Sequence, residues 1–269
     1  MSRVNVAFMT HRGSVRPQNQ DALQIAGDVR TGDMDRPDNF DLEGFQMPLL
    51  LSVADGLGGH SGGERAAEIV VRALAAGADR FDPALDPDAD ERLLRDLLNA
   101  AAEEIHAASL RDPNLYGMGA TVAGVVIRER SVLAFNCGDC RAYRFFAGGE
   151  ADEDGEGDGE RLTHDHSVVQ ALRDNGDITE DEMRAHPRKN VVTSAIAADV
   201  FDGFELYVKP VSRTRDDAFL ICSDGVWEAL ALPDLARFTR DSEPDAPKKF
   251  FEALIGARCR DNVSFIRVR

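Results

Sequence analysis

The chain has 269 residues, 43% of them hydrophobic, which is enough to bury one large core or two small ones. Its net charge of −17 would repel a polyanionic backbone, which argues against nucleic-acid binding. The longest apolar run, Met47–Ala54, is too short to span a bilayer, and the N-terminus lacks a stretch of signal-peptide length. We therefore expect a soluble, cytoplasmic protein without membrane contact.

The first half of the chain is predicted to contain strands followed by two helices. Alternating or continuous apolar residues predict strands over Val4–Met9, Asp21–Ala26 and Pro48–Ala54. Apolar residues at helical spacing predict helices over Gly62–Asp79 and Asp90–Leu110, and the acidic first turn of the second suits the helix dipole.

Two acidic segments show no such pattern. Residues 27–44 contain five aspartates and little periodicity, and residues 148–160 alternate glycine with acidic residues and offer no apolar anchor. Strand-like sequence continues on both sides of each segment. We interpret both as mobile insertions in one compact fold, and not as linkers between domains.

The second half changes to short strands. Tight turns separate apolar segments at Thr121–Ile127, Ser131–Cys137 and Arg141–Phe146, which favours antiparallel hairpins because no crossover helix fits between them. The remaining elements are two short helices, two strands, two helices and a final strand: Ser167–Asn175, Thr179–Ala185, Phe204–Lys209, Asp217–Cys222, Pro233–Thr239, Ala246–Ala257 and Val263–Val268. An order without regular βαβ alternation predicts the α+β class.

Aspartate beside glycine or asparagine recurs at the ends of apolar, strand-like runs. The pattern occurs at Asp55-Gly56, Gly138-Asp139, Asp224-Gly225 and Asp261-Asn262. Such residues also make ordinary turns, and one occurrence would need no other explanation. Four strand ends of this kind can place their aspartates at one point. Their carboxylates would then repel one another unless a divalent cation bound between them. Carboxylate and carbonyl oxygens suit Mg²⁺ or Mn²⁺, so the pattern predicts a metal site for phosphate chemistry.

Two nearby residues extend this prediction. Arg16 precedes Asp21 by five residues and offers a planar fork suited to phosphate oxygens, although a surface arginine is usually just solvated. His60 follows the glycine-rich segment after Asp55, where it could donate a proton. His164 and His166 could imitate a metal cluster, but we favour a helix N-terminus there, with Asp165 or Ser167 near the cap.

The four cysteines do not complete a recognisable site. Cys137 and Cys140 form a C-x-x-C pair, but no second pair or pair of histidines accompanies them as structural zinc requires. We interpret Cys137, Cys140, Cys222 and Cys259 as free, structural thiols in a reducing compartment.

Eight motifs in one order complete the pattern. They are G-S-V-R-P-Q-N-Q-D, V-A-D-G-L-G-G-H-S-G-G-E, G-M-G-A-T, N-C-G-D-C-R-A-Y, L-T-H-D-H-S, G-D-I-T-E-D-E-M-R-A-H-P, L-I-C-S-D-G-V-W and D-N-V-S. From about Val4 to Val268 the chain resembles the metal-dependent Ser/Thr protein phosphatases of type 2C, in their compact bacterial form. Each motif alone is weak, whereas the ordered set is specific.

The resemblance implies a single catalytic domain over residues 1–269. Its fold would be a four-layer α-β-β-α sandwich of two antiparallel sheets flanked by helices, with a flap at about residues 165–190. The matched positions imply two core Mn²⁺ or Mg²⁺ ions and a weaker third. Their ligands would be Asp55 as the bridge, the Gly56 carbonyl, Asp224, Asp261, Asp21 through water, and Asp139 with Asp224 at the third ion.

The resemblance also implies the catalytic roles and the partners. Arg16 would bind phosphate and His60 would act as the general acid in hydrolysis of phosphoserine and phosphothreonine by a metal-activated water. The substrates would be phosphoproteins, and a bacterial Ser/Thr kinase would act in opposition to a monomeric enzyme. The alternatives are a pseudophosphatase that binds a partner, which would have lost metal aspartates, and another two-metal hydrolase such as a nuclease, which the acidic charge disfavours.

Three departures from the family pattern are present. Gln20 stands where many members have glutamate, and Cys140 replaces the usual serine. After the flap, Thr193-Ser194-Ala195-Ile196-Ala197 replaces the common T-R-A-L-G, which affects the expected flap conformation and substrate contacts. All the matched metal carboxylates are present.

Overall fold

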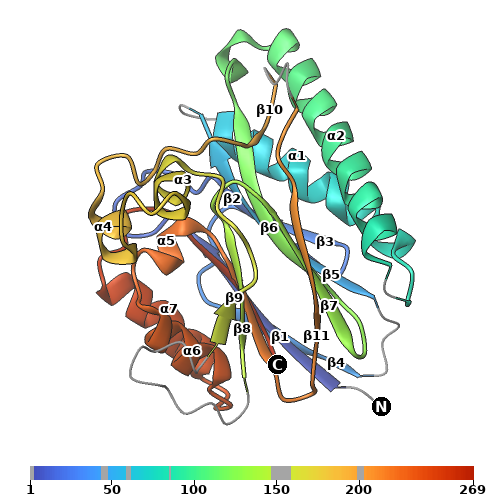
Figure 1. Cartoon of the computed structure of the whole chain (residues 1–269), viewed down its shortest axis with the longest axis vertical. Coiled ribbons are helices and arrows are strands. Elements are labelled where there is room, and N and C mark those ends of the chain that lie inside the picture. Colours follow the sequence, from blue (N-terminus) through green and yellow to red (C-terminus); the bar gives the residue numbers. More distant parts are fainter. Residues whose placement is uncertain (1–2, 44–47, 59–61, 85, 147–158, 199–202) are drawn as a thin grey trace.

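Two antiparallel β-sheets face each other in the computed structural model, and helices cover the outer face of each (Figure 1). The structure describes residues 3–43, 48–58, 62–84, 86–146, 159–198 and 203–269. In this part of the chain the first sheet has the order β4 (Asp38–Glu43), β1 (Arg3–His11), β13 (Val263–Val268), β12 (Ala218–Cys222), β8 (Arg141–Phe145) and β9 (Gly159–Arg161).

The second sheet is built around the long strands of the first half of the chain. Its order is β11 (Tyr207–Ser212), β7 (Ser131–Cys137), β6 (Gly119–Ile127), β5 (Leu49–Leu57), β2 (Asp21–Ile25) and β3 (Asp28–Thr31), with β10 (Ile196–Ala197) paired to β6. The predicted α+β class and the α-β-β-α layers are confirmed.

Apolar residues on both faces of the strands create three adjoining cores. Along β5, Leu49, Leu51 and Val53 pack between the sheets, whereas Leu50 and Ala54 pack toward the helices on the other face. This follows from the two-residue period of a strand, which sends successive side chains to opposite faces. A run that is apolar at every position therefore belongs to a strand covered on both sides, as the continuous run before Asp55 requires.

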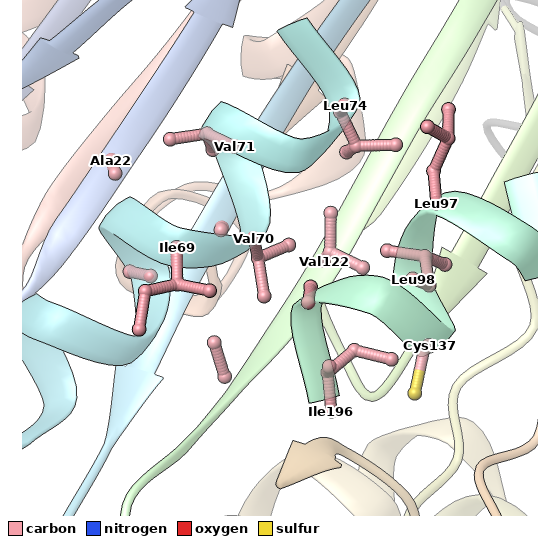
Figure 2. Close-up of a cluster of buried hydrophobic side chains, with 14 of the residues drawn as sticks. Ala22, Ile69, Val70, Val71, Leu74, Leu97, Leu98, Val122, Cys137 and Ile196 are labelled. Carbon is pink, nitrogen blue, oxygen red and sulfur yellow. The ribbon is translucent and has the colours of Figure 1, made fainter. Parts of the chain in front are cut away.

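Two helices cover the second sheet. They are α1 (Gly62–Ala76) and α2 (Pro87–Arg111), and Figure 2 shows their apolar stripes meeting over the strands. Ile69 and Val70 of α1 lie in one buried cluster with Leu98 of α2. The Asp86 side chain accepts a hydrogen bond from the Ala89 amide at 3.1 Å and caps α2, which begins with proline.

The first sheet is covered by the last two helices, α6 (Leu232–Arg240) and α7 (Ala246–Gly256). Phe250 of α7 joins them to the sheet because its ring centroid lies 5.2 Å from that of Phe238 and 4.5 Å from that of Phe265 on β13. Aromatic pairs at these separations add to the energy of burial alone. The cluster stabilises the layer on the side opposite to α1 and α2 (Figure 1).

Two short helices lie in the segment predicted to be a flap. They are α3 (Val168–Asp174) and α4 (Glu180–Ala185). The Ser167 hydroxyl caps α3 by accepting a hydrogen bond from the Gln170 amide at 3.2 Å. Ser167 is one of the two residues that were predicted near this cap. Thr179 and Glu182 form a reciprocal capping box on α4. These caps satisfy amides that such short helices would otherwise leave unpaired.

The prediction of a mobile loop over residues 27–44 is wrong for its described part. Residues 28–31 and 38–43 form β3 and β4, which pair with β2 and β1 at the edges of the two sheets. These edge strands are short and rich in aspartate, and only Val29 of β3 and Phe40 and Leu42 of β4 pack against a core, so the apolar signal is weak. Of the other predicted loop, over residues 148–160, residues 148–158 lie outside the described residues. The prediction is wrong for residues 159 and 160, which belong to β9.

The three predicted hairpin strands also divide differently. β6 and β7 pair as predicted, but β8 leaves them and pairs with β12 of the first sheet. The chain crosses between the sheets at Gly138, which has a φ of +97° that favours glycine. Farther along, the strand predicted over Phe204–Lys209 is displaced to β11, and a short helix, α5 (Asp224–Trp227), follows β12.

The cysteines take part in packing. All four are free and buried, and Cys137 lies under the helices whereas Cys140 lies between the sheets. The C-x-x-C pair is therefore split across two cores. Among the described residues, no helix is both long and apolar enough to span a membrane.

Candidate active site

Two of the predicted carboxylates face each other across the second sheet. β2 begins at Asp21 and β5 continues through Asp55, so the antiparallel register sets Asp21 directly opposite Asp55. The Cβ atoms of such opposed residues lie about 4.5–5.5 Å apart. On its other side Asp55 lies opposite Thr121 of β6. The pairing of adjacent strands therefore places two like charges side by side.

Three further carboxylates reach the same end of the sandwich. Asp139 lies on the connection from β7 to β8, Asp224 follows β12 and opens α5, and Asp261 precedes β13. The pKa of Asp55 is raised mainly by burial, and next by the negative charges of four other carboxylates: Asp21, Asp224, Asp139 and Asp261. Segments from both sheets thus bring five carboxylates into one electrostatic neighbourhood.

Burial and mutual repulsion disfavour the charged form of these groups. Burial is the largest cause in each case, and it holds the pKa of Asp55 and of Asp224 well above the ordinary value. The pKa of Asp21 is raised to about 6 and that of Asp139 to about 7. A divalent cation beside them would favour the ionised form instead.

The oxygen atoms of the cluster fit such a cation. Asp21 Oδ1 and Asp224 Oδ1 are buried without a hydrogen-bond partner, whereas Asp21 Oδ2 accepts a hydrogen bond from Ser223 Oγ at 2.9 Å. Buried acceptors without partners are costly, so their presence indicates a ligand. In the described part of the chain, no group of three or more acidic, histidine or cysteine side chains is arranged so that it could hold a metal ion. The fit therefore depends on the two unpaired oxygens and on the chemistry of the donors.

Arg16 lies beside this cluster and is paired within it. Its Nε and Nη2 atoms donate to the two carboxylate oxygens of Asp261 at 2.9 and 2.6 Å, which raises the pKa of Arg16. Half of the arginine side chain, 51%, remains exposed. The predicted phosphate-binding residue thus meets the carboxylate that lies 245 residues away, a pairing that no local motif could indicate.

Close backbone contacts explain the glycine after Asp55. A Cβ atom at Gly56 would collide with the Gly63 carbonyl group and lie 2.7 Å from the Gln20 carbonyl oxygen. The Gly56 amide donates to that same Gln20 oxygen at 3.2 Å. Only glycine therefore allows β5, the segment before β2 and the start of α1 to converge here. His60, the predicted proton donor, lies outside the described residues.

Asn262 is a residue whose role the sequence reasoning missed. Its side-chain oxygen accepts from the Gln20 amide at 2.9 Å, and its Nδ2 donates to the Arg12 and Gln18 carbonyl oxygens at 3.1 and 2.9 Å. One amide side chain thus holds the loop that carries Arg16 against the start of β13. The polar residue directly after Asp261 was the available signal, because a buried asparagine there must find partners.

The family model for protein phosphatase 2C matches residues 32–254. The chain belongs to this family. Serine/threonine phosphatase stp of Listeria welshimeri is 29% identical to it over 223 residues, which are 83% of this chain and 78% of that protein. Serine/threonine protein phosphatase PstP of Mycobacterium tuberculosis is 31% identical over 254 residues. That match covers 88% of this chain but only 41% of PstP.

Solved structures agree with this assignment. The crystal structure of M. tuberculosis PstP has a TM-score of 0.78 with this 2C phosphatase at 25% identity, over 99% of this chain and 98% of that one. The Streptococcus agalactiae serine/threonine phosphatase has a TM-score of 0.80 at 23% identity, over 98% of each chain, and shows the shared fold. The PstP catalytic domain has also been solved in complex with two manganese ions, with a TM-score of 0.74 at 24% identity, over 99% of this chain and 98% of that one.

A buried polar cluster supports Asp139 in the phosphatase. The Trp227 indole donates to the Asp139 carbonyl oxygen at 3.0 Å, and the Arg141 guanidinium lies 3.5 Å from the centroid of the Trp227 ring. Arg141 also binds Asp165, with its closest contact at 2.6 Å. Asp165 therefore does not cap α3, and its charge offsets a buried guanidinium instead. The cluster was not predicted because its members come from three separate motifs.

His166 connects the flap segment to the same loop. Its Nδ1 accepts a hydrogen bond from the Gly138 amide at 3.0 Å, and its own amide donates to the Gly138 carbonyl oxygen at 2.9 Å. Burial lowers the pKa of His166, which keeps Nδ1 available as an acceptor. In the described residues the histidine therefore has a structural role near the N-terminus of α3, consistent with the favoured interpretation.

Proposed function

We propose that this phosphatase hydrolyses phosphoserine and phosphothreonine in proteins at the carboxylate cluster, using two Mn²⁺ or Mg²⁺ ions. The observation that carries the proposal is the pair of buried, unpartnered oxygens on Asp21 and Asp224 among five converging carboxylates. The two manganese ions of the PstP catalytic domain support the choice of ion and the number. No observation favours the pseudophosphatase alternative.

The proposed ligands follow the matched motifs. Asp55 would be the ligand shared by the two ions, and the Gly56 carbonyl oxygen would bind one of them. Asp224 and Asp261 would complete the protein ligands, and Asp21 would act through bound water. These positions come from both sheets, which is consistent with a site at the end of the sandwich.

A third, weaker ion is proposed between Asp139 and Asp224. The electrostatics of the two residues support this ion. Burial is the largest cause of the raised pKa of Asp224, and the negative charge of Asp139 is the next largest. The Asp139 main chain is held by Trp227, which leaves its carboxylate as the part able to respond to a cation.

The ions, when bound, would supply the charge that activates water as the nucleophile and holds the phosphoryl oxygens. Arg16 binds Asp261 through its Nε and Nη2 atoms. Its remaining guanidinium N–H groups would orient the phosphate by donating to a phosphoryl oxygen. His60 is proposed to protonate the leaving serine or threonine oxygen. General acid catalysis of this kind contributes about 10²–10⁴-fold.

The setting of the enzyme is also part of the proposal. We infer that residues 1–269 act as one catalytic domain with a flap at about 165–190, as a cytoplasmic monomer. Its substrates are phosphoproteins, and a Ser/Thr kinase acts in opposition. The names of the stp and PstP relatives support the substrate class.

Hydrolysis of a phosphothreonine peptide tests the proposal directly. We expect turnover with Mn²⁺ or Mg²⁺ in the millimolar range, loss of turnover with EDTA, and recovery when the ion is restored. Alkylation of thiols should have no effect, because the four cysteines are buried and the mechanism uses none of them. Full turnover in metal-free buffer would exclude the two-ion assignment.

A further inference from the structure

The turn between α7 and β13, residues 257–261, contains a strained residue beside the carboxylate cluster. Arg258 has a φ of +54°, in the left-handed region that favours glycine. Its amide donates to the Ile255 carbonyl oxygen at 3.0 Å, and the Cys259 amide donates to the Leu254 carbonyl oxygen at 3.5 Å. These two hydrogen bonds form a Schellman motif, in which the left-handed position is usually glycine. An arginine at this position therefore has a backbone cost that glycine would avoid.

The side chain of Cys259 fastens this turn to the reaction centre. Its Sγ atom donates to the carbonyl oxygen of Gly225 in α5 at 3.0 Å. The Cys259 carbonyl oxygen accepts from the Ser14 amide at 3.4 Å, two residues before Arg16. The turn is therefore held between α5 and the loop that carries Arg16, and it leads directly into Asp261.

Two arginines flank this anchor and are accessible from solvent. Arg258 and Arg260 are exposed, whereas Cys259 between them is buried. Arg260 directly precedes Asp261, the carboxylate that Arg16 binds. Neither Arg258 nor Arg260 has a carboxylate partner among the described residues. Two guanidinium groups are thus placed at the edge of the reaction centre with their charge available.

The charge of this turn differs from that of the whole molecule. The chain has a net charge of −17, so the molecule as a whole repels an acidic segment. On α7, Glu252 pairs with Lys248, and on the loop that carries Arg16, Arg12 pairs with Asp33. These neighbouring acidic residues have cations of their own. The two arginines of the turn therefore suit carboxylates of a bound polypeptide.

We propose that Arg258 and Arg260 bind acidic side chains that flank the phosphorylated residue of a protein substrate, so that the enzyme selects phosphorylated segments rich in aspartate or glutamate. The backbone of Arg258 supports the proposal, because a turn with only a structural role would favour glycine at this position. The inference rests on the proposed phosphatase function and deepens it by naming the class of substrate. The two arginines contact the polypeptide and not the phosphoryl group.

The first test compares substrates on the wild-type enzyme with Mn²⁺. Two phosphothreonine peptides differ only in having aspartates or serines beside the phosphorylated residue, and p-nitrophenyl phosphate has no peptide. We expect kcat/KM for the aspartate peptide to exceed that for the serine peptide by about fivefold to tenfold at low ionic strength, and the preference to disappear in about 0.5 M NaCl. Equal kcat/KM values for the two peptides at low ionic strength would overturn the proposal.

The variant Arg258→Gly separates recognition from stability. Glycine relieves the left-handed backbone, so the melting temperature should rise by about 2–4 °C. KM for the aspartate peptide should rise by about threefold to fivefold, and both constants for the serine peptide and for p-nitrophenyl phosphate should stay within about twofold of the wild type. If the arginine served only the helix dipole of α7, the variant would melt at a lower temperature and keep the wild-type preference. That result would contradict a role in substrate binding.

The matched control is Ala26→Gly. Ala26 has a φ of +53° and is the other residue besides glycine with a positive φ in the described part of the chain. It lies in the turn between β2 and β3, at the end of β2 that is opposite to Asp21. This variant should gain a similar melting temperature and leave KM and kcat for all three substrates unchanged. A loss of the peptide preference here would show that backbone strain, and not the arginine, sets the preference.

Reversal of the second charge gives an independent result. For Arg260→Glu, we expect KM to rise by about tenfold for the aspartate peptide and to fall for a peptide with lysines at the same positions. The ratio of the two KM values is unaffected by a general loss of activity, and an unchanged ratio would exclude Arg260 from recognition. If the wild type hydrolyses none of the substrates with Mn²⁺, the proposed function has failed and this inference fails with it. Normal turnover without a preference overturns this inference alone.

Discussion

The buried negative charge of Asp55 destabilises the folded chain, and a bound cation would remove this effect. It is held opposite Asp21 by the strand register, and its pKa is raised by burial and by four neighbouring carboxylates. Asparagine has nearly the same shape without the charge. Replacing Asp55 by asparagine should therefore affect two properties differently: stability without metal should be kept, and activity with metal should be lost.

Asp55→Asn should reduce turnover with Mn²⁺ by at least about a thousandfold, about 4 kcal/mol of transition-state stabilisation. In EDTA at pH 8 the variant should be at least as stable toward urea as the wild type, because the buried repulsion is gone. Calorimetric titration with Mn²⁺ and urea unfolding measure the two effects. Undiminished binding of two ions would contradict the bridging role.

His166 should make stability depend on pH. Burial lowers its pKa in the folded state, so the unfolded chain binds the proton more readily. The contribution of neutral His166 to the free energy of unfolding is therefore complete above the ordinary pKa of about 6.5. It is lost as the pH falls toward the lower pKa of the folded state. The neighbouring charges are Glu205, at 3.8 Å, and His164 and Asp165.

His166→Asn tests this contribution because the asparagine oxygen can still accept from the Gly138 amide. The melting temperature of both proteins is measured in EDTA from pH 8 to pH 5. We expect the variant to lose less stability than the wild type below about pH 6.5. Parallel curves would show that the histidine is not held neutral by the fold.

Strand-end aspartates could be placed from sequence because each follows or precedes an apolar run that needs two covered faces. The partners that orient them could not be placed in the same way. The Arg16–Asp261 pair joins the two ends of the chain, and Asn262 holds a loop more than 240 residues away. Such contacts depend on which strands become neighbours, and local pattern does not contain that information.

At the scale of elements, a buried ion pair fastens α2 to the turn after β6. Arg128 Nη2 lies 2.9 Å from Asp90 Oδ1, and both side chains are almost completely buried. Arg128 Nε also donates to the Asp82 carbonyl oxygen at 2.8 Å. Removing the carboxylate would leave a buried guanidinium without its counter-charge, which is more costly than the pair is stabilising.

Asp90→Ala should therefore lower the free energy of unfolding by about 3–5 kcal/mol. The control is Glu91→Ala, the next residue on α2, which removes an exposed pair with Arg95 and should cost about 0.5 kcal/mol or less. Urea denaturation of both variants measures the difference. Equal, small losses would mean that water reaches Arg128 and replaces its partner.

Elements were predictable where burial imposes a period. The sequence pattern locates α1 and α2 by their apolar stripes and β5 by its continuous apolar run, because each of these elements must cover or fill a core. β3 and β4 were missed because edge strands need few apolar side chains: only Val29 of β3 and Phe40 and Leu42 of β4 pack against a core, and the residues between them are polar. The division of β7 and β8 between sheets was missed because the short connection at Gly138 resembles a hairpin turn in sequence.

At the scale of the whole molecule, the proposed ion site joins the two sheets. Asp21 and Asp55 belong to the second sheet, whereas Asp224 and Asp261 adjoin β12 and β13 of the first. Between the sheets lies an apolar core. Ions held by both sets of carboxylates would close one end of the sandwich.

Binding of Mn²⁺ should therefore stabilise both sheets together. At a hundredfold excess over the dissociation constant, a ligand specific for the folded state adds about 2.7 kcal/mol, which corresponds to a rise of about 5–8 °C in melting temperature. Hydrogen exchange should slow at the site ends of β2 and β5 and also at those of β12 and β13. Asp55→Asn should show neither effect. Protection confined to β2 and β5 would mean that Asp224 and Asp261 do not share the ions, and the site would then belong to one sheet alone.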